Sequence, residues 1–214
     1  MNFKKRQAVE IFRHQLSGSR YLICIDLEAT CDDYPKSMSA ADRAGCSLLV
    51  TPEEMEIIEV GLVTLDLLQH YQVVTNFSQF VQPILHPNLT PFCKALTGIK
   101  QHDVDNAQPF SKVSQIVDTL LQPFLIEGVV WCSWGTYDAE QMKRDCARLG
   151  VKSSLNDLKH LSVDLFYSSF FDTPAPDLKE AVESLGITWE GQYHRALDDS
   201  RHLARLVTKL LETL

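Results

Sequence analysis

Apolar residues in this chain fall into short unbroken runs, separated by longer stretches where they recur every three or four positions. Residues 21–25 (YLICI) and 128–132 (GVVWC) are unbroken runs, which is typical of strands buried on both faces of a sheet. Residues 56–65 and 71–81 are rich in β-branched and aromatic side chains, and the five residues between them suit a hairpin turn. We therefore expect a central sheet in which this hairpin lies next to the first strand.

Helical spacing marks most of the remaining chain. Pro91 follows Thr90 as a first helical residue follows its N-cap, and Gly150 closes a second predicted helix. Strands that alternate with helices in this way predict an α/β fold. The expected helices lie in residues 1–20, from residue 91, in 109–125, 137–149 and 177–185, and from residue 195 to the C-terminus.

The length and composition are those of one globular domain. The chain has 214 residues, of which 45% are hydrophobic and 22% charged. No internal repeat divides it, so we expect a basic N-terminal helix or extension (residues 1–20) and one domain (residues 21–214). The polar stretch 31–55, with its two prolines, is expected to be a long surface loop that either covers the substrate or is disordered.

Charge and cysteine usage limit the partners and the compartment. A net charge of −8 argues against a broad basic face that binds duplex nucleic acid, but it is compatible with binding the end of a single-stranded nucleic acid. No apolar run approaches the ~20 residues that span a membrane, and we expect neither a signal peptide nor membrane association. The six cysteines are scattered without a C-x-x-C pair, so a cytoplasmic protein without a zinc site is expected.

Two carboxylates follow the first buried strand. Side chains alternate along a strand, so Asp26 and Glu28 point to the same side. Carboxyl ends of central strands are where open α/β sheets bind ligands. Like charges in that position repel each other, and a hard divalent cation offsets them well. A D-x-E pattern taken alone also fits two residues that end a strand and face water.

Three further candidates lie in two other segments. Asp138 falls in the first turn of a helix that follows a strand, where a carboxylate also suits the helix dipole. His194 precedes the last helix and has a side chain suited to accept a proton from water, although a loop histidine is often merely exposed. Asp199 shares its helix face with the leucines that follow, whereas Asp198 lies on the same face as His202, Arg205 and Lys209, which we expect to be wet.

Taken together, these pieces resemble the DEDDh 3′-to-5′ exonucleases, which have a ribonuclease H-like fold. The first motif corresponds to Asp26-Leu27-Glu28, the second to the Asp138 of SWGTYD, and the third, H-x4-D, to His194 and Asp199. The chain is most similar to the branch that holds the histone-mRNA 3′ exonuclease and the enhanced-RNA-interference exonucleases. The segments that carry this similarity are DLEATC, EIIE, FCKALTGI and LDDSRHLARL.

The resemblance implies a three-layer fold with a central mixed five-stranded sheet, and hydrolysis of single-stranded 3′ ends to 5′-nucleoside monophosphates. Two Mg²⁺ or Mn²⁺ ions ~4 Å apart would be held by the four carboxylates, with Asp26 bridging both, while His194 deprotonates water. The residues that would contact the terminal nucleotide are Leu27, Ala29, Thr30, Leu96, Ile99 and Trp134.

Three other functions fit parts of the pattern. One is an endonuclease or another phosphodiesterase on a ribonuclease H-like fold, although such enzymes place their acids differently and do not need the H-x4-D ending. A catalytically silent interaction module of the same fold is expected to lack at least one of the five motif residues, and none is missing here. A DNA proofreading-type exonuclease would carry the same motifs, although the LTGI and SWG segments favour the RNA-trimming branch. The sequence does not decide between RNA and DNA as the substrate, and it leaves protein partners unknown.

Overall fold

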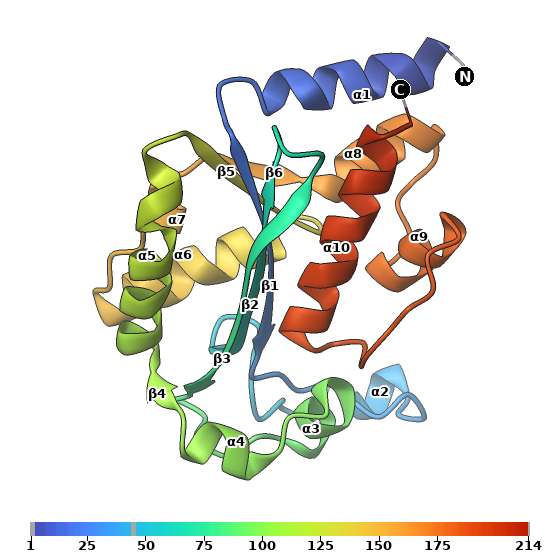
Figure 1. The fold of residues 1–214 in the computed structure, drawn as a ribbon. Coiled ribbons are helices and arrows are strands. Elements are labelled where there is room, and N and C mark those ends of the chain that lie inside the picture. The colour runs from blue at the N-terminus through green and yellow to red at the C-terminus, as the bar shows by residue number, and fades with distance from the viewer. Residues whose placement is uncertain (1–2, 44–45, 214) are drawn as a thin grey trace.

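A mixed six-stranded sheet forms the centre of the computed structural model, which describes residues 3–43 and 46–213 (Figure 1). The strand order is β4-β3-β2-β1-β5-β6. Strand β2 is antiparallel to both β1 and β3, while β5 is parallel to β1 and β6. The strands are β1 (Tyr21–Ala29), β2 (Ile57–Asp66), β3 (Gln72–Gln82), β4 (Gln108–Pro109), β5 (Val129–Ser133) and β6 (His160–Ser162).

Helices cover both faces of the sheet, so the predicted three-layer α/β fold is confirmed (Figure 1). One face carries α5 (Phe110–Leu125) and α6 (Tyr137–Leu149). The other carries α1 (Phe3–Gln15), α8 (Val163–Phe171), α9 (Leu178–Ser184) and α10 (Ala196–Leu211). Shorter helices lie in the connections: α2 (Ala40–Arg43), α3 (Pro91–Thr97), α4 (Gln101–Asp105) and α7 (Ser154–Asp157).

The number of strands corrects the expectation of five, since the described residues form six. Strands β4 and β6 have two and three residues. Segments this short hold too few positions for an alternation of apolar and polar side chains to be read. Helix α8 is a further element that the sequence pattern did not predict. It buries Val163, Phe166, Tyr167 and Phe170 at helical spacing, but its serines and aromatic residues have only moderate helix propensity.

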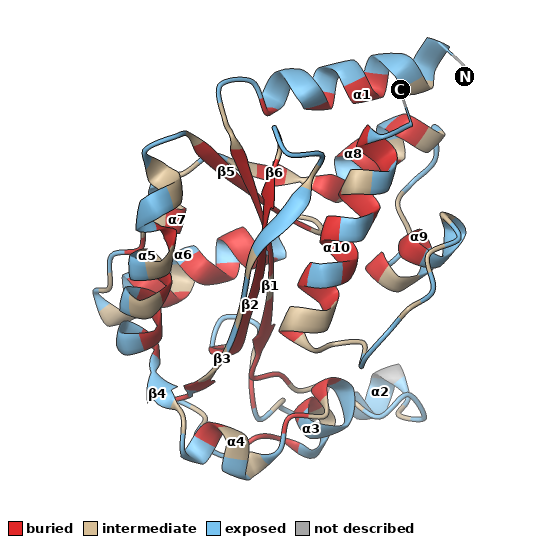
Figure 2. Cartoon of the chain, in the orientation of Figure 1, coloured by how far each residue is buried: buried red, intermediate tan, exposed pale blue. Residues whose placement is uncertain are grey.

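Alternation along β1 explains which way the two acids point. Leu22 and Cys24 pack into the core cluster that contains α10, while Ile23 and Ile25 pack into the cluster that contains α5 and α6. Continuing this period places Asp26 and Glu28 on the α10 side. The strand is buried over most of its length, as the red central strands in Figure 2 show. The sheet therefore delivers both carboxylates toward the last helix.

Several local expectations are confirmed. The β2–β3 hairpin lies next to β1, and the Thr90 Oγ1 accepts the N–H of Cys93 at 2.9 Å as the N-cap of α3. Gly150 ends α6 in the left-handed conformation with φ 63°. The 31–55 stretch is largely irregular and includes only α2 among its described residues.

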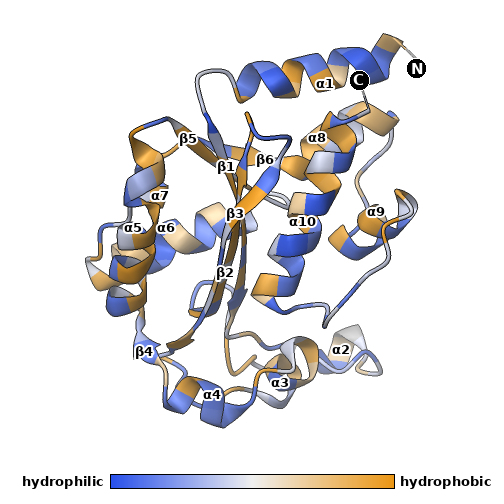
Figure 3. Cartoon of the chain, in the orientation of Figure 1, coloured by the Kyte–Doolittle hydropathy of each residue, from blue (hydrophilic) through white to orange (hydrophobic). Residues whose placement is uncertain are grey.

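Helix α1 packs on the same core as the rest of the fold. The ring of Phe12 stacks on that of Phe166 with centroids 4.1 Å apart, and Ala8, Val9 and Leu16 are also buried. Hydrophobic and hydrophilic segments alternate along α1 and α10 (Figure 3), as is typical of helices with one buried face. The separation of residues 1–20 from residues 21–214 remains a prediction. Among the described residues, no helix combines the length and the hydropathy needed to cross a membrane.

Candidate active site

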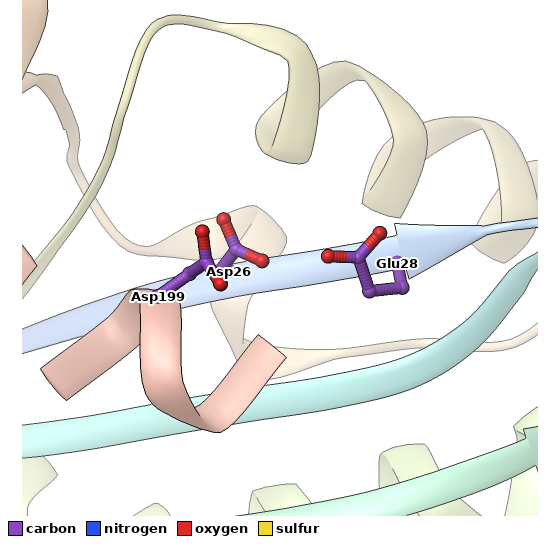
Figure 4. Close-up of side chains that lie close together, drawn as sticks. All are labelled: Asp26, Glu28 and Asp199. Carbon is purple, nitrogen blue, oxygen red and sulfur yellow. The ribbon is translucent and has the colours of Figure 1, made fainter. Parts of the chain in front are cut away.

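Asp26, Glu28 and Asp199 meet at the carboxyl end of β1. Each offers a carboxylate oxygen, and these three oxygens all lie within 4.8 Å of one another. Figure 4 shows the side chains of Asp26 and Glu28 on β1, with that of Asp199 extending from the start of α10 toward Asp26. Asp199 is 3% exposed and its Oδ2 accepts the backbone N–H of Arg195 at 3.0 Å. The expectation that Asp199 lies on the buried face of the last helix is thus confirmed.

Asp138 approaches the same strand from the other side. It lies in the first turn of α6, directly after β5, and is 4% exposed. Its Oδ1 accepts the N–H of Leu27 at 2.9 Å, the residue between the two acids of β1. The structure therefore brings together all four carboxylates of the three motifs, although Asp138 lies outside the tight cluster of three.

Burial raises the pKa values of all four carboxylates, and the charges of neighbouring motif acids raise those of Asp26 and Glu28 further. Burial raises the pKa of Asp26 well above its usual range, and the charges of Asp138 and Glu28 raise it further. Burial followed by the charge of Asp199 raises the pKa of Glu28 to about 9. Burial raises the pKa values of Asp138 and Asp199 to about 7 each. The ionised cluster is thus unfavourable in the absence of a counter-charge.

The described residues provide no cationic partner for these carboxylates. Among the ion pairs of the described residues, none joins a lysine, arginine or histidine to any of these four carboxylates. Carboxylate oxygens at this spacing are the donors that Mg²⁺ and Mn²⁺ prefer. The residues present therefore fit a divalent metal centre.

Divalent metal should stabilise the fold more at pH 8 than at pH 5. Carboxyl pKa values that are raised in the folded state make the metal-free protein lose stability as the pH rises from about 4, the unfolded value, through the folded values of about 7 to 9. Metal at 100 times its dissociation constant adds about 2.7 kcal/mol to the free energy of unfolding. At low pH, protons compete with the metal for the carboxylates, so this gain is smaller. Thermal melts at both pH values, each with Mn²⁺ and with EDTA, would measure the stabilisation. An equal rise in melting temperature with Mn²⁺ at pH 5 and pH 8 would contradict the prediction.

His194 stands at the mouth of the cluster in a strained conformation. Its φ is 63°, in the left-handed region that few residues other than glycine adopt. The ring lies against that of Tyr193, with centroids 4.0 Å apart. Partial burial lowers the pKa of His194, so the imidazole is neutral at physiological pH and free to accept a proton.

A cavity of about 280 Å³ connects these groups. Of the predicted nucleotide contacts, Leu27, Ala29, Leu96 and Trp134 line it, together with the five motif residues. Thr30 and Ile99 do not, because they are 1% and 0% exposed and pack behind the cavity wall. Five further residues line the cavity that the sequence did not single out: Cys31, Met55, Tyr137, Leu178 and Tyr193. Cys31 and Tyr137 lie within the DLEATC and SWGTYD segments and Tyr193 adjoins His194, whereas Met55 and Leu178 carry no such signal. A larger groove of about 650 Å³ runs along the outer side of α10, away from all five motif residues.

Asp198 and His202 lie outside the cluster, on the other side of α10. Asp198 accepts the N–H of Gln192 at 3.0 Å and pairs with Arg201 at 3.4 Å, so it braces the loop that carries His194. The expectation that His202 lies on a wet face is wrong, since it is 2% exposed. The chain before α10 covers this side chain. The Trp189 ring stacks on the His202 imidazole with centroids 3.9 Å apart, and His202 Nε2 accepts the N–H of Glu190 at 3.0 Å.

Comparisons with known proteins agree with this arrangement. The profile of the RNase_T family, described as Exonuclease, matches residues 23–207. The 3′-5′ exonuclease eri1 of Schizosaccharomyces pombe is 30% identical over 89% of this chain and 68% of its own length. The 3′-5′ exoribonuclease 1 of Mus musculus is 28% identical over 99% of this chain, which spans 59% of the mouse protein.

Solved structures show the same relationship. A 3′-exonuclease that recognises the histone mRNA stem-loop matches with a TM-score of 0.76 and 27% identity, over 92% of this chain and 83% of that one. The nuclease domain of 3′hExo, a DEDDh family member bound to rAMP, gives the same TM-score and identity over 92% and 94%. The chain therefore belongs to the RNase_T exonuclease family and to its DEDDh group of 3′-5′ exonucleases.

Proposed function

We propose that this protein shortens single-stranded RNA from its 3′ end by hydrolysis and releases 5′-nucleoside monophosphates. The observation that carries the proposal is the convergence of four uncompensated carboxylates and a neutral histidine on one cavity. RNA is favoured over DNA because relatives that match nearly the whole chain are named exoribonucleases. Cytoplasmic localisation stays a prediction from the cysteine pattern.

The four carboxylates Asp26, Glu28, Asp138 and Asp199 would hold the metal, and we propose two Mg²⁺ or Mn²⁺ ions. When ionised, these groups carry four negative charges, twice what one divalent cation neutralises. Bound ions would offset the charge of the scissile phosphate and make the attacking water more acidic. The carboxylates themselves orient that site, because hydrogen bonds such as that from the N–H of Leu27 to Asp138 fix their directions.

His194 acts as the proton acceptor for the attacking water. Its imidazole lines the cavity together with the carboxylates, and its lowered pKa keeps it unprotonated before the reaction. The contact with the Tyr193 ring restricts the imidazole to one orientation. His194 takes the proton at a ring nitrogen as the water oxygen bonds to phosphorus and the P–O3′ bond breaks. The leaving 3′ oxygen takes a proton from solvent, and His194 returns its own proton to solvent after the product leaves.

The cavity volume suits one nucleotide rather than a strand. About 280 Å³ is at the small end of ligand sites, so we propose that only the 3′-terminal nucleotide enters. Trp134 offers an aromatic face for stacking and Leu96 an exposed apolar side chain. Leu27 and Ala29 contribute the wall along β1. Thr30 does not reach the cavity and supports its wall, because its Oγ1 accepts the N–H of Glu56 at 2.9 Å.

The function is tested with 5′-labelled single-stranded RNA and DNA, each with Mg²⁺ or Mn²⁺. A ladder that shortens from the 3′ end, faster for RNA and absent with EDTA, is the expected result. A covalently closed circular RNA should stay intact, since it has no 3′ end. Intact linear strands with both metals would instead indicate a catalytically silent interaction module, and faster loss of DNA would favour the proofreading type.

His194→Ala should lower kcat by about 10²- to 10⁴-fold, the usual contribution of a general base. The KM for single-stranded RNA should change little, because the carboxylates and the nucleotide contacts remain. Steady-state kinetics on the labelled RNA measures both values. His102→Ala serves as the control, since its side chain is 70% exposed. Unchanged kcat in the His194 variant would remove the histidine from the mechanism.

A further inference from the structure

The EIIE segment at the start of β2 contains an acid with no part in the site described above. Glu59 is 1% exposed and lies opposite Glu28 in the β1–β2 pairing. Unlike the four motif carboxylates, it has a cationic partner. Arg195 Nε donates to its Oε2 at 3.0 Å and Arg195 Nη2 to its Oε1 at 3.1 Å. This bidentate pair gives Glu59 a cationic partner of its own, which the four motif carboxylates do not have among the described residues.

Further contacts complete this pair on both sides. The Ser78 Oγ donates to Glu59 Oε1 at 2.9 Å, and the guanidinium lies over the Phe80 ring, 5.1 Å from its centroid. The N–H of Ala196, the first residue of α10, also donates to Glu59 Oε2 at 3.3 Å. Glu59 thus accepts hydrogen bonds from the side chain before the last helix and from the backbone of its first turn.

Strand β2 and the start of α10 are also in direct contact. The Ser200 Oγ donates to the carbonyl of Gly61 at 2.9 Å. A Cβ atom at Gly61 would overlap the backbone of Ala196 and Leu197, so only glycine permits this approach. We call the contacts of Glu59, Gly61, Arg195 and Ser200 the β2–α10 clasp.

The clasp holds the segment on which two motif residues depend. The backbone N–H of Arg195 donates to Asp199 Oδ2 at 3.0 Å, so the direction of that carboxylate follows the position of Arg195. His194 is the preceding residue, and its φ of 63° persists only if the neighbouring chain is held in place. A displacement of Arg195 would therefore move both the proton acceptor and a metal-holding carboxylate.

We infer that Glu59 and Arg195 are positioning residues that fix His194 and Asp199 for hydrolysis. The inference rests on the proposed function and adds residues outside the D-E-D-H-D pattern. Neither side chain lines the cavity, so both act through the backbone of residues 194–199. Glu59→Gln should lower kcat by about 10²-fold, the scale of an approximately 1 Å misplacement, with little change in the KM for RNA.

The same strand supplies a matched control. At the far end of β2, Asp66 pairs with Arg20 through two hydrogen bonds, at 3.1 and 2.8 Å. The side-chain exposures are alike: 30% and 3% for Arg20 and Asp66, against 29% and 1% for Arg195 and Glu59. Glu59→Gln and Asp66→Asn should lower the melting temperature similarly, whereas only the former should lower kcat. Arg195→Lys and Arg20→Lys provide a second, milder pair.

A double variant separates positioning from general destabilisation. If Glu59 acts through His194, then Glu59→Gln should cost a smaller factor in kcat in a His194→Ala background than in the wild type. A purely structural role would reduce activity by the same factor in both backgrounds. Equal factors, or a loss in Asp66→Asn as large as that in Glu59→Gln, would overturn the inference while leaving the active site intact. A wild-type protein that degrades no RNA would overturn the proposed function and this inference with it.

Discussion

Asp26→Asn should abolish nuclease activity while making the metal-free protein more stable. Asp26 lies at the centre of the acidic cluster, within reach of both Glu28 and Asp199. An amide there removes one negative charge from the metal-holding set, and we expect the rate to fall by about 10³-fold or more. The labelled-RNA assay with Mn²⁺ measures this loss.

The opposite effect on stability has the same cause. The pKa of Asp26 is raised by its burial and by the charges of Asp138 and Glu28, so the ionised carboxylate costs folding free energy at pH 7.5. Asparagine keeps the shape without the charge, and the melting temperature in EDTA should rise. Asp157→Asn, at an exposed position, is the control for both measurements. A lower melting temperature, or retained activity, would contradict this account of the cluster.

Gly61→Ala should strongly destabilise the protein and also impair catalysis. The added Cβ overlaps main-chain atoms of Ala196 and Leu197, which cannot rotate away as a side chain can. The start of α10 must then move, at a cost of about 3 kcal/mol, the upper part of the usual range for overpacking. Because His194 and Asp199 flank these residues, kcat should also fall by about 10²-fold. Chemical denaturation and RNA kinetics measure the two effects.

Gly150→Ala is a suitable control for that variant. Gly150 ends α6 with φ 63°, and a Cβ there meets nothing within 4 Å. The substitution should lower the free energy of unfolding by about 1 kcal/mol, because alanine disfavours the left-handed backbone conformation. It should leave kcat unchanged. If Gly61→Ala proved as mild as this control, the close approach of β2 to α10 would not be a requirement of the active site.

The site was more predictable from sequence than its surroundings because its chemistry is carried by local patterns. Asp26 and Glu28 share a face through strand alternation, and Asp199 follows the leucines of α10 through helical phase. Their meeting point followed from the resemblance to a family rather than from either pattern alone. By contrast, His202 has the helical phase of a surface residue, and only the return of the chain at Trp189 buries it.

The cavity wall shows the limit of single-sequence reasoning most clearly. Met55 and Leu178 come from segments far apart in the chain and carry no motif, yet both line the cavity. Ile99 belongs to the LTGI segment and was expected to contact the base, but it packs against Ile58 and Val104 in a small core of its own. Such contacts depend on tertiary packing between distant segments, which neither periodicity nor capping signals encode.

Hydrolysis in ¹⁸O-labelled water tests the central claim most directly. Single-stranded RNA would be digested with Mn²⁺ in this solvent, and the released nucleotides analysed by mass spectrometry. If water activated at the carboxylate and histidine site attacks the phosphorus atom, the products are 5′-monophosphates that each carry one ¹⁸O on the phosphate. Products that carry a 3′-phosphate, or 5′-monophosphates without the label, would contradict the proposed chemistry.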